Sequence, residues 1–98
     1  MAKTYTHSVW TVKPGQEDEF VRRWRDLADW SALQGLSGAA TLLRDFDDPR
    51  LFVSFAPWES LERVANWRGS RGFHERIARL HEVVDQFEPR TLIVVAES

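Results

Sequence analysis

The segment from Asn66 to His81 contains the side chains best suited to chemistry in this chain of 98 residues. It holds His74 and His81, which are two of the three histidines, and it begins beside Trp67. Histidine readily accepts a proton near neutral pH, and an indole N–H can donate a hydrogen bond to a substrate oxygen. These three residues are therefore the candidate catalytic residues.

The two histidines of this segment do not form a predicted metal site. On a continuous helix they lie roughly 20° apart around the axis but about 10 Å apart along it, whereas a shared metal ion needs both nitrogens about 2 Å away. Ala78 stands where the H-E-x-x-H motif requires its second histidine. The chain also lacks cysteine, so we expect no metal and no cofactor. A structural role, as partly buried residues beside a core-facing stripe, is the alternative for both histidines.

A second group of residues is suited to lining a pocket for a flat ligand. Tryptophan supplies planar apolar walls, and a serine on an apolar face indicates incomplete packing at that point. Ordinary core packing is the alternative for the aromatic members. His7 is expected on the opposite face of its strand. The candidate substrate-binding residues are Ser8, Trp10, Trp24, Ser31, Trp58 and Ile77.

The composition excludes several classes of protein. Hydrophobic residues make up 43% of the chain and charged residues 29%, as in soluble globular domains. A net charge of -2 provides no general attraction to nucleic acid or to anionic membranes. No apolar run approaches the roughly 20 residues of a membrane helix, and the first ten residues lack the apolar core of a signal peptide. We expect one cytoplasmic domain over residues 1–98, with neither nucleic acid nor membrane as partner.

Sequence patterns predict four strands and two helices. Segments rich in β-branched and aromatic residues predict strands at 5–12, 39–45, 50–56 and 90–96. Helices are expected at 16–33 and 57–84, the second interrupted at Gly69–Gly72. The order β-α-β-β-α-β is that of the ferredoxin-like α+β fold, a four-stranded antiparallel sheet with two helices on one face.

Two of the predicted strands are apolar on both faces. Val53 and Phe55 alternate with Phe52 and Ala56, and Leu92 to Val95 is apolar throughout. Two helices can cover only one face of such a sheet. We therefore expect a homodimer in which the uncovered sheet faces pack together.

Three stretches of the sequence point to a known family. They are VKPGQEDEF, LLRDFDDPRLFVSF and WESLERVANWRGSRGF, and over nearly the whole chain they resemble the antibiotic-biosynthesis-monooxygenase superfamily. The most specific part is the spacing of Trp58, Glu59, Ser60, Trp67, Ser70 and Phe73. The resemblance implies a dimeric α+β barrel with a pocket in each subunit between sheet and helices. It also implies either cofactor-free oxidation of electron-rich aromatic substrates, such as polyketide anthrones, or degradation of haem.

Two positions depart from the haem-degrading branch of that superfamily. Its members carry an Asn on the first strand, a Trp on the second helix and a haem-binding His about three turns later. Trp67 matches the Trp, but Ile77 stands at the position of the His and Ser8 near that of the Asn. We therefore do not expect haem degradation by that mechanism.

Three functions are consistent with parts of this sequence. The first is cofactor-independent monooxygenation of a small aromatic substrate, which needs an apolar pocket, a base and donors for an oxyanion. The second is a non-catalytic dimer of the same fold that binds a small molecule or a partner. The third is an RNA-binding domain, because residues 52–55 match the end of an RNP1 motif, but DPRL replaces its first half and the acidic balance opposes RNA binding. We favour the first and keep the second as the alternative.

Overall fold

The structure is a computed structural model that describes residues 3–98. The expected domain of residues 1–98 thus includes two residues that lie outside the described part. The elements in chain order are β1 (Thr4–Val12), α1 (Glu17–Ser31), β2 (Thr41–Arg44), β3 (Leu51–Trp58), α2 (Leu61–Arg68), α3 (Arg71–His81) and β4 (Val84–Ile93).

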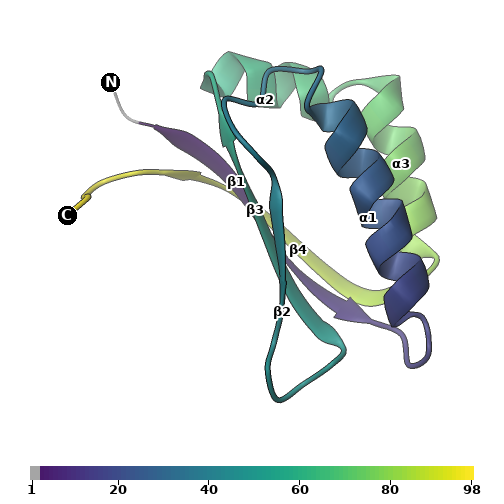
Figure 1. Cartoon of the computed structure of the whole chain (residues 1–98). Helices are drawn as coiled ribbons and strands as arrows, with labels where there is room; N and C mark the ends of the chain where they lie inside the picture. Colours follow the sequence, from purple (N-terminus) through teal and green to yellow (C-terminus); the bar gives the residue numbers. More distant parts are fainter. Residues whose placement is uncertain (1–2) are drawn as a thin grey trace.

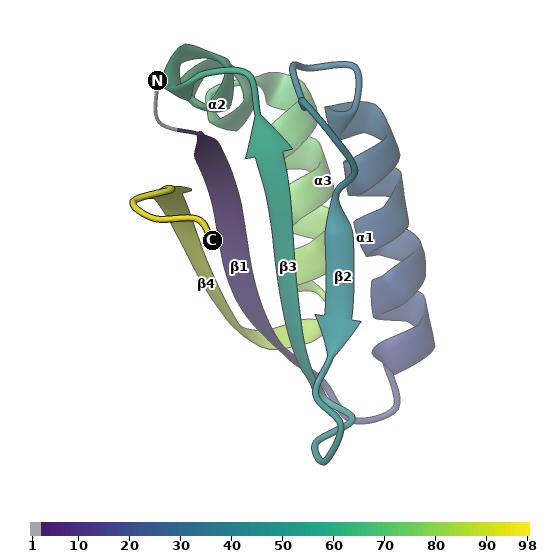
Figure 2. The ribbon, with the colours of Figure 1, turned by 60° about the vertical axis from the view of Figure 1, so that its left-hand side comes forward.

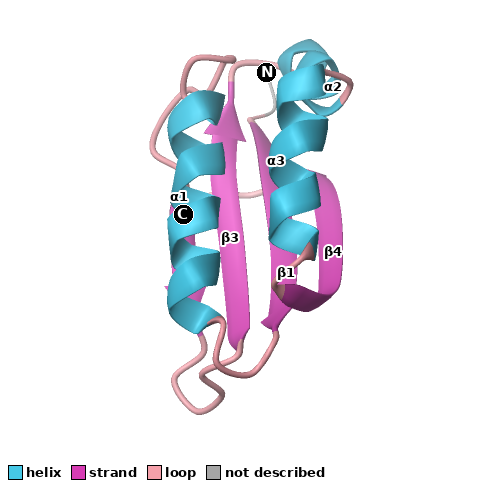
Figure 3. Ribbon diagram, turned by 90° about the vertical axis from the view of Figure 1, so that its right-hand side faces the viewer, coloured by secondary structure: helices cyan, strands magenta, loops and turns pink. Residues whose placement is uncertain are grey.

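The strands form one antiparallel sheet in the order β2-β3-β1-β4, which can be followed across Figure 2. The helices all lie on one side of it (Figure 1). Figure 3 shows α1 and α3 side by side over the sheet, with α2 at one end. The predicted ferredoxin-like α+β fold is confirmed. No helix within residues 3–98 is both long and apolar enough to cross a membrane.

The central strand β1 directs alternate side chains to the two faces of the sheet. Thr6, Ser8, Trp10 and Val12 face the helices, as their alternation requires, and Trp10 is only 2% exposed. Ser54 on β3 is the register partner of Ser8. Two serines therefore stand side by side on the face that the helices cover.

An aromatic cluster packs α1 against this face. The ring of Trp10 lies 5.3 Å from that of Phe20 on α1 and stacks on Phe87 of β4 at 4.3 Å. Phe20 also lies 4.9 Å from Phe52 of β3. These contacts bury apolar surface from four elements at one end of the sheet and fix the height of α1 above it.

The interrupted second helix is two separate helices. Ser60 caps α2 by accepting a hydrogen bond from the N–H of Arg63 (3.1 Å), and Ser70 caps α3 in the same way from Phe73 (3.2 Å). Such caps satisfy N–H groups that have no partner within the helix. The predicted start of the second helix at residue 57 is wrong, because Pro57 and Trp58 are the last two residues of β3.

The last strand starts earlier than predicted. It begins at Val84 instead of residue 90, and α3 ends at His81 instead of residue 84. Pro89, which suggested a break, lies inside β4 opposite Ser8. Proline is tolerated there because β4 is an edge strand, so one of its sides needs no ladder hydrogen bonds.

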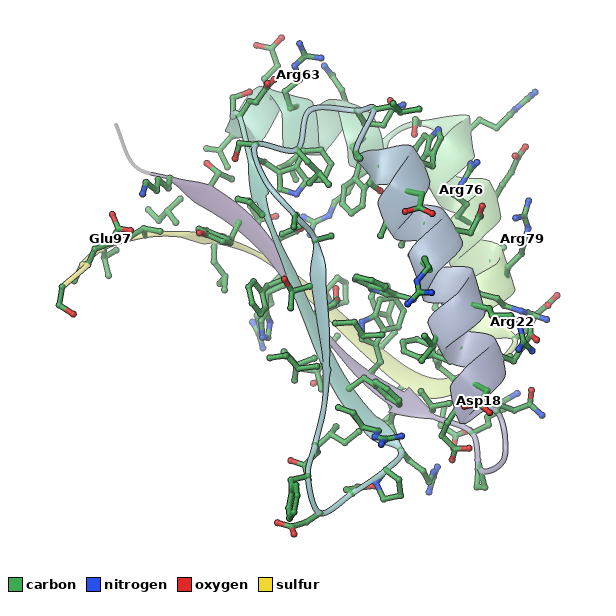
Figure 4. The ribbon with its side chains drawn as sticks, viewed as in Figure 1. Asp18, Arg22, Arg63, Arg76, Arg79 and Glu97 are labelled. Carbon is green, nitrogen blue, oxygen red and sulfur yellow. The ribbon has the colours of Figure 1, made fainter. Side chains whose placement is uncertain are left out.

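Charged side chains gather on the outside of the two long helices. Figure 4 shows Arg22, Arg76 and Arg79 on the side of α1 and α3 that faces away from the sheet. The carboxylate of Asp26 lies 3.4 Å from Arg76 and 3.3 Å from Arg79. Such pairs at the protein surface contribute about 0–1 kcal/mol each. Their main consequence is that these charges lie outside the space between helices and sheet.

Close packing between α1 and α3 leads to a first prediction. A Cβ atom on Gly72 would overlap the ring of Trp30, lying 2.8 Å from its Cε2 atom, and that ring also supports the guanidinium of Arg76 at 4.6 Å. We expect Gly72→Ala to lower the free energy of unfolding by about 1–3 kcal/mol through overpacking, measured by urea denaturation. Gly69→Ala is the control, since its new Cβ would approach only two backbone carbonyl oxygens, at 3.3 and 4.0 Å. Equal losses in the two variants would contradict overpacking as the cause.

Candidate functional site

A cavity lies between the sheet and the three helices. Together with its open mouth it encloses about 520 Å³ of empty space. Its wall is mainly apolar and aromatic. The aromatic rings bordering it on the helix side of the sheet belong to Trp10, Trp24, Trp58, Trp67, Phe73 and Phe87.

Most of the residues selected from the sequence border this cavity. β1 and β3 bring their members to its floor, α1 brings two to one wall, and α2 and α3 bring one each to the other. Seven of the nine candidates are placed together in this way: Ser8, Trp10, Trp24, Ser31, Trp58, Trp67 and Ile77.

The two candidate histidines do not border the cavity. His74 and His81 are both exposed on α3, and the ring of His81 packs edge-on against Phe87 at 5.6 Å. The prediction of a pocket position for His74 is wrong because Phe73 and Ile77 form the stripe of α3 that faces the cavity. A rotation of about 100° per residue turns His74 out of that stripe. The proposed role of these histidines as a base depended on the pocket position, so we do not carry it further.

His7 lies on the other face of the sheet, as expected. It is the register partner of Phe55 on β3 and of Arg90 on β4, and alternation along β1 points it away from Thr6 and Ser8. Its Nδ1 atom is buried and has no hydrogen-bond partner within residues 3–98. In the same part of the chain, no group of three or more His, Cys, Asp or Glu could hold a metal ion.

Three tryptophans of the cavity wall are held by hydroxyl groups. A buried indole N–H needs an acceptor, and each of these N–H groups donates to a serine or threonine oxygen. The pairs are Trp10 with Ser54 (2.9 Å), Trp58 with Thr6 (2.9 Å) and Trp67 with Ser31 (2.8 Å). Each bond fixes one wall of the cavity to a neighbouring element.

The three hydroxyl groups differ in whether they also donate a hydrogen bond to a protein acceptor. Ser31 donates to the carbonyl oxygen of Leu27 at 2.6 Å, so its donor is used. Within residues 3–98 neither Thr6 nor Ser54 donates to a protein acceptor, although both border the cavity. A hydroxyl that accepts from an indole N–H is polarised to donate more strongly. The floor of the cavity therefore presents two O–H donors to a ligand oxygen, with the hydroxyl of Ser8 beside them.

One arginine also borders the cavity. Arg68, the last residue of α2, donates hydrogen bonds to the hydroxyl of Thr91 and to the carbonyl oxygen of Arg90 (3.1 Å) on β4. It is half-buried, and burial lowers the pKa of its guanidinium from the ordinary arginine value. It forms no ion pair with any carboxylate in the described part of the chain.

Sequence reasoning missed the polar residues of the floor and the arginine. Ser54 stands between Phe52 and Ala56, two residues that the alternation assigns to one face. A polar residue among such apolar positions was the signal available for Ser54. Thr6 lies two residues before Ser8, so the same alternation predicts that both side chains face the helices. No comparable signal marked Arg68, because its placement depends on where the end of α2 meets β4.

Comparison with known families identifies the chain. The profile of the family described as "Antibiotic biosynthesis monooxygenase" matches residues 5–79. The protein belongs to the antibiotic biosynthesis monooxygenase family. The resemblance seen in the sequence is thereby confirmed. No functionally curated protein matches the chain.

Several solved structures share the fold of this family member. SnoaB, described as a cofactor-independent oxygenase from Streptomyces nogalater, is 22% identical with a TM-score of 0.89, over 97% of this chain and 95% of SnoaB. A conserved protein from Methanosarcina mazei is 18% identical with a TM-score of 0.80, covering 96% and 92% of the two chains. One of unknown function from Bacteroides thetaiotaomicron is 12% identical with a TM-score of 0.83, covering 95% and 98%. At these identities the likeness establishes the fold.

The bond between Trp67 and Ser31 can be tested by stability. We expect Ser31→Ala to lower the free energy of unfolding by about 1–3 kcal/mol, because it leaves a buried indole N–H without an acceptor. Urea denaturation measures the loss, and Ser37→Ala at an exposed site is the control. In a Trp67→Phe background, Ser31→Ala should cost much less. An undiminished cost in that background would show that the bond is not the cause.

Proposed function

We propose that this protein is a cofactor-independent monooxygenase that oxidises a small aromatic substrate bound in the cavity. The observation that carries the proposal is the combination of aromatic walls with two free hydroxyl donors, Thr6 and Ser54, on the floor. Flat aromatic rings would bind between the tryptophans, and a ring oxygen would accept from the floor. The description of SnoaB as a cofactor-independent oxygenase supports the same class of reaction.

The proposed reaction is oxidation of an anthrone-type methylene group by O2. Loss of one proton gives the enolate, whose oxygen carries the negative charge. The enolate passes one electron to O2, and the resulting radical and superoxide combine, forming a C–O bond. Protonation gives the hydroperoxide, which loses the remaining C–H proton and hydroxide as its O–O bond breaks. The sum is CH2 + O2 → C=O + H2O, with the substrate as the only reductant.

The protein's contribution would be to stabilise the enolate. Donors aimed at a developing oxyanion in a site sheltered from water are among the largest catalytic effects. Thr6 and Ser54 would supply such donors, and each is held in place by the indole that donates to it. Within residues 3–98 His7 is the one histidine that borders the cavity, and strand alternation points its side chain to the other face of the sheet. The substrate proton would therefore pass to water at the cavity mouth. Stabilisation of the enolate by the floor donors would make the substrate a stronger acid and so favour this transfer.

A second candidate function is binding without catalysis. Apart from His7, whose side chain points to the other face of the sheet, no side chain that could act as a base borders the cavity in the described residues, and this favours binding alone. A carrier or sensor needs only the aromatic walls and the polar floor. The two candidates differ in one measurable respect, which is consumption of O2 in the presence of a bound substrate.

We also propose that two copies of the chain pair through the uncovered sheet face. Val9, Val53 and Phe55 alternate onto that face, and Leu43 beside Val53 is 52% exposed. Leu92 is 43% exposed on the same face of β4. Burial of these apolar side chains, which extend over three or more strands, against the same face of a second copy would stabilise the pair.

The oxygenase proposal predicts O2 uptake by the purified protein with a neutral anthrone such as dithranol. The product quinone should contain one oxygen atom from 18O2, and the protein should show no flavin or haem absorption. Ser54→Ala should lower kcat/KM about a hundredfold, through loss of an oxyanion donor, with Ser37→Ala unchanged as control. Binding of anthrones without any O2 uptake above the uncatalysed rate would favour the non-catalytic candidate.

The dimer proposal predicts a solution mass of twice the 11.4 kDa of the chain, measured by light scattering at micromolar concentration. Leu43→Glu should shift the mass towards the monomer, because it buries a carboxylate in the sheet interface. Leu33→Glu, at a site 81% exposed in the turn after α1, should leave the dimer intact. A native mass of one chain would overturn the proposal.

A further inference from the structure

The charge on Arg68 is the feature of the cavity that the proposed oxygenation does not use. The guanidinium is half-buried, and its hydrogen bonds go to neutral oxygens on Thr91 and Arg90. These two bonds engage two of its five N–H groups. Partial desolvation of a cation without a counter-charge costs free energy, and an anionic group on a ligand would offset that cost.

No carboxylate of the described residues lies within the 4.0 Å of an ion pair from the Arg68 guanidinium. The part of β4 that it contacts contributes a hydroxyl and a carbonyl oxygen, and α2 contributes the ring of Trp67, whose centre lies 5.9 Å from the guanidinium carbon. The acidic side chains that form ion pairs in this chain are paired with other cations: Glu19, Asp26, Glu59, Glu82, Asp85 and Glu97. The remaining N–H groups of Arg68 are thus available to an acceptor that enters the cavity.

The residue of β4 that Arg68 contacts lies beside a hydroxyl group of the cavity floor. Thr91, which it contacts, is the register partner of Thr6 on β1, and neighbouring strands lie about 4.7–4.9 Å apart. The anchor of the guanidinium is therefore one strand spacing from a free hydroxyl on the floor. A single ligand can reach both, with one oxygen at the floor and a second polar group at the end of the cavity formed by α2 and β4.

We propose that Arg68 binds a carboxylate of the substrate, so that the cavity selects small aromatic acids over neutral aromatic compounds. This inference rests on the proposed use of the cavity for aromatic ligands and adds the substrate's charge to it. The forked guanidinium matches the two oxygens of a carboxylate. The aromatic part of the acid would lie against Trp67 and Phe73, with the floor donors left for a ring oxygen.

The test compares two ligands that differ only in charge. Anthraquinone-2-carboxylate and anthraquinone-2-carboxamide are titrated into the protein, with binding followed by quenching of tryptophan fluorescence. The native protein should bind the carboxylate about ten- to a hundredfold more tightly, as expected for hydrogen bonds to a charged group. Arg68→Met should lose this preference while its affinity for the carboxamide stays within about twofold. Arg71→Met removes an exposed charge nearby and should keep the preference.

Each other outcome overturns a defined part of the proposal. Equal binding of both ligands by the native protein would overturn the role of Arg68 and leave the oxygenase proposal standing. An equal loss of affinity for both ligands in Arg68→Met would show that Arg68 only supports the fold between α2 and β4. Binding of neither ligand by the native protein would overturn the carboxylate proposal, and O2 uptake with a neutral anthrone would then still test the oxygenase separately.

Discussion

The structure depends on finding an acceptor for each buried indole N–H. Five tryptophans in 98 residues supply much of the buried apolar surface of a small domain, but each brings one polar hydrogen into it. Three of these hydrogens are satisfied by hydroxyl groups from other elements. An indole held in this way cannot turn to fill the space beside it. The rings therefore stand as fixed walls, and the space between them remains as a cavity.

The same bonds give the cavity its polarity. A hydroxyl that satisfies an indole still carries a proton, and on Thr6 and Ser54 that proton has no acceptor in the described residues. Structural hydrogen bonds thereby leave donors directed at whatever occupies the cavity. No carboxylate of residues 3–98 forms an ion pair with Arg68, so the protein does not neutralise this cation. An apolar space with donors and one cation, but no acid, is complementary to an electron-rich or anionic aromatic molecule.

A thin domain also leaves one face of its sheet uncovered. The helices occupy a single side, and the opposite face carries Val9, Val53 and Phe55 together with the exposed Leu43. His7 lies on that face with an unsatisfied Nδ1 atom. A second copy of the chain would cover the apolar residues and could supply an acceptor or donor to this nitrogen. The catalytic and oligomeric proposals thus concern opposite faces of the same central strand, β1.

The sequence by itself determined the order of the elements, because alternation of period two and helical periodicity are local properties. The family was indicated by the resemblance of three sequence stretches to its members. The sequence also identified most of the cavity wall, since Ser8, Trp10 and Trp58 follow from strand alternation and motif spacing. Tertiary structure decided the rest. The indole–hydroxyl pairs join residues 36 to 52 positions apart, and no local pattern specifies such partners. His74 turns outward because packing of Phe73 and Ile77 sets the rotation of α3. Arg68 meets β4 only because the fold brings the end of α2 to Arg90 and Thr91.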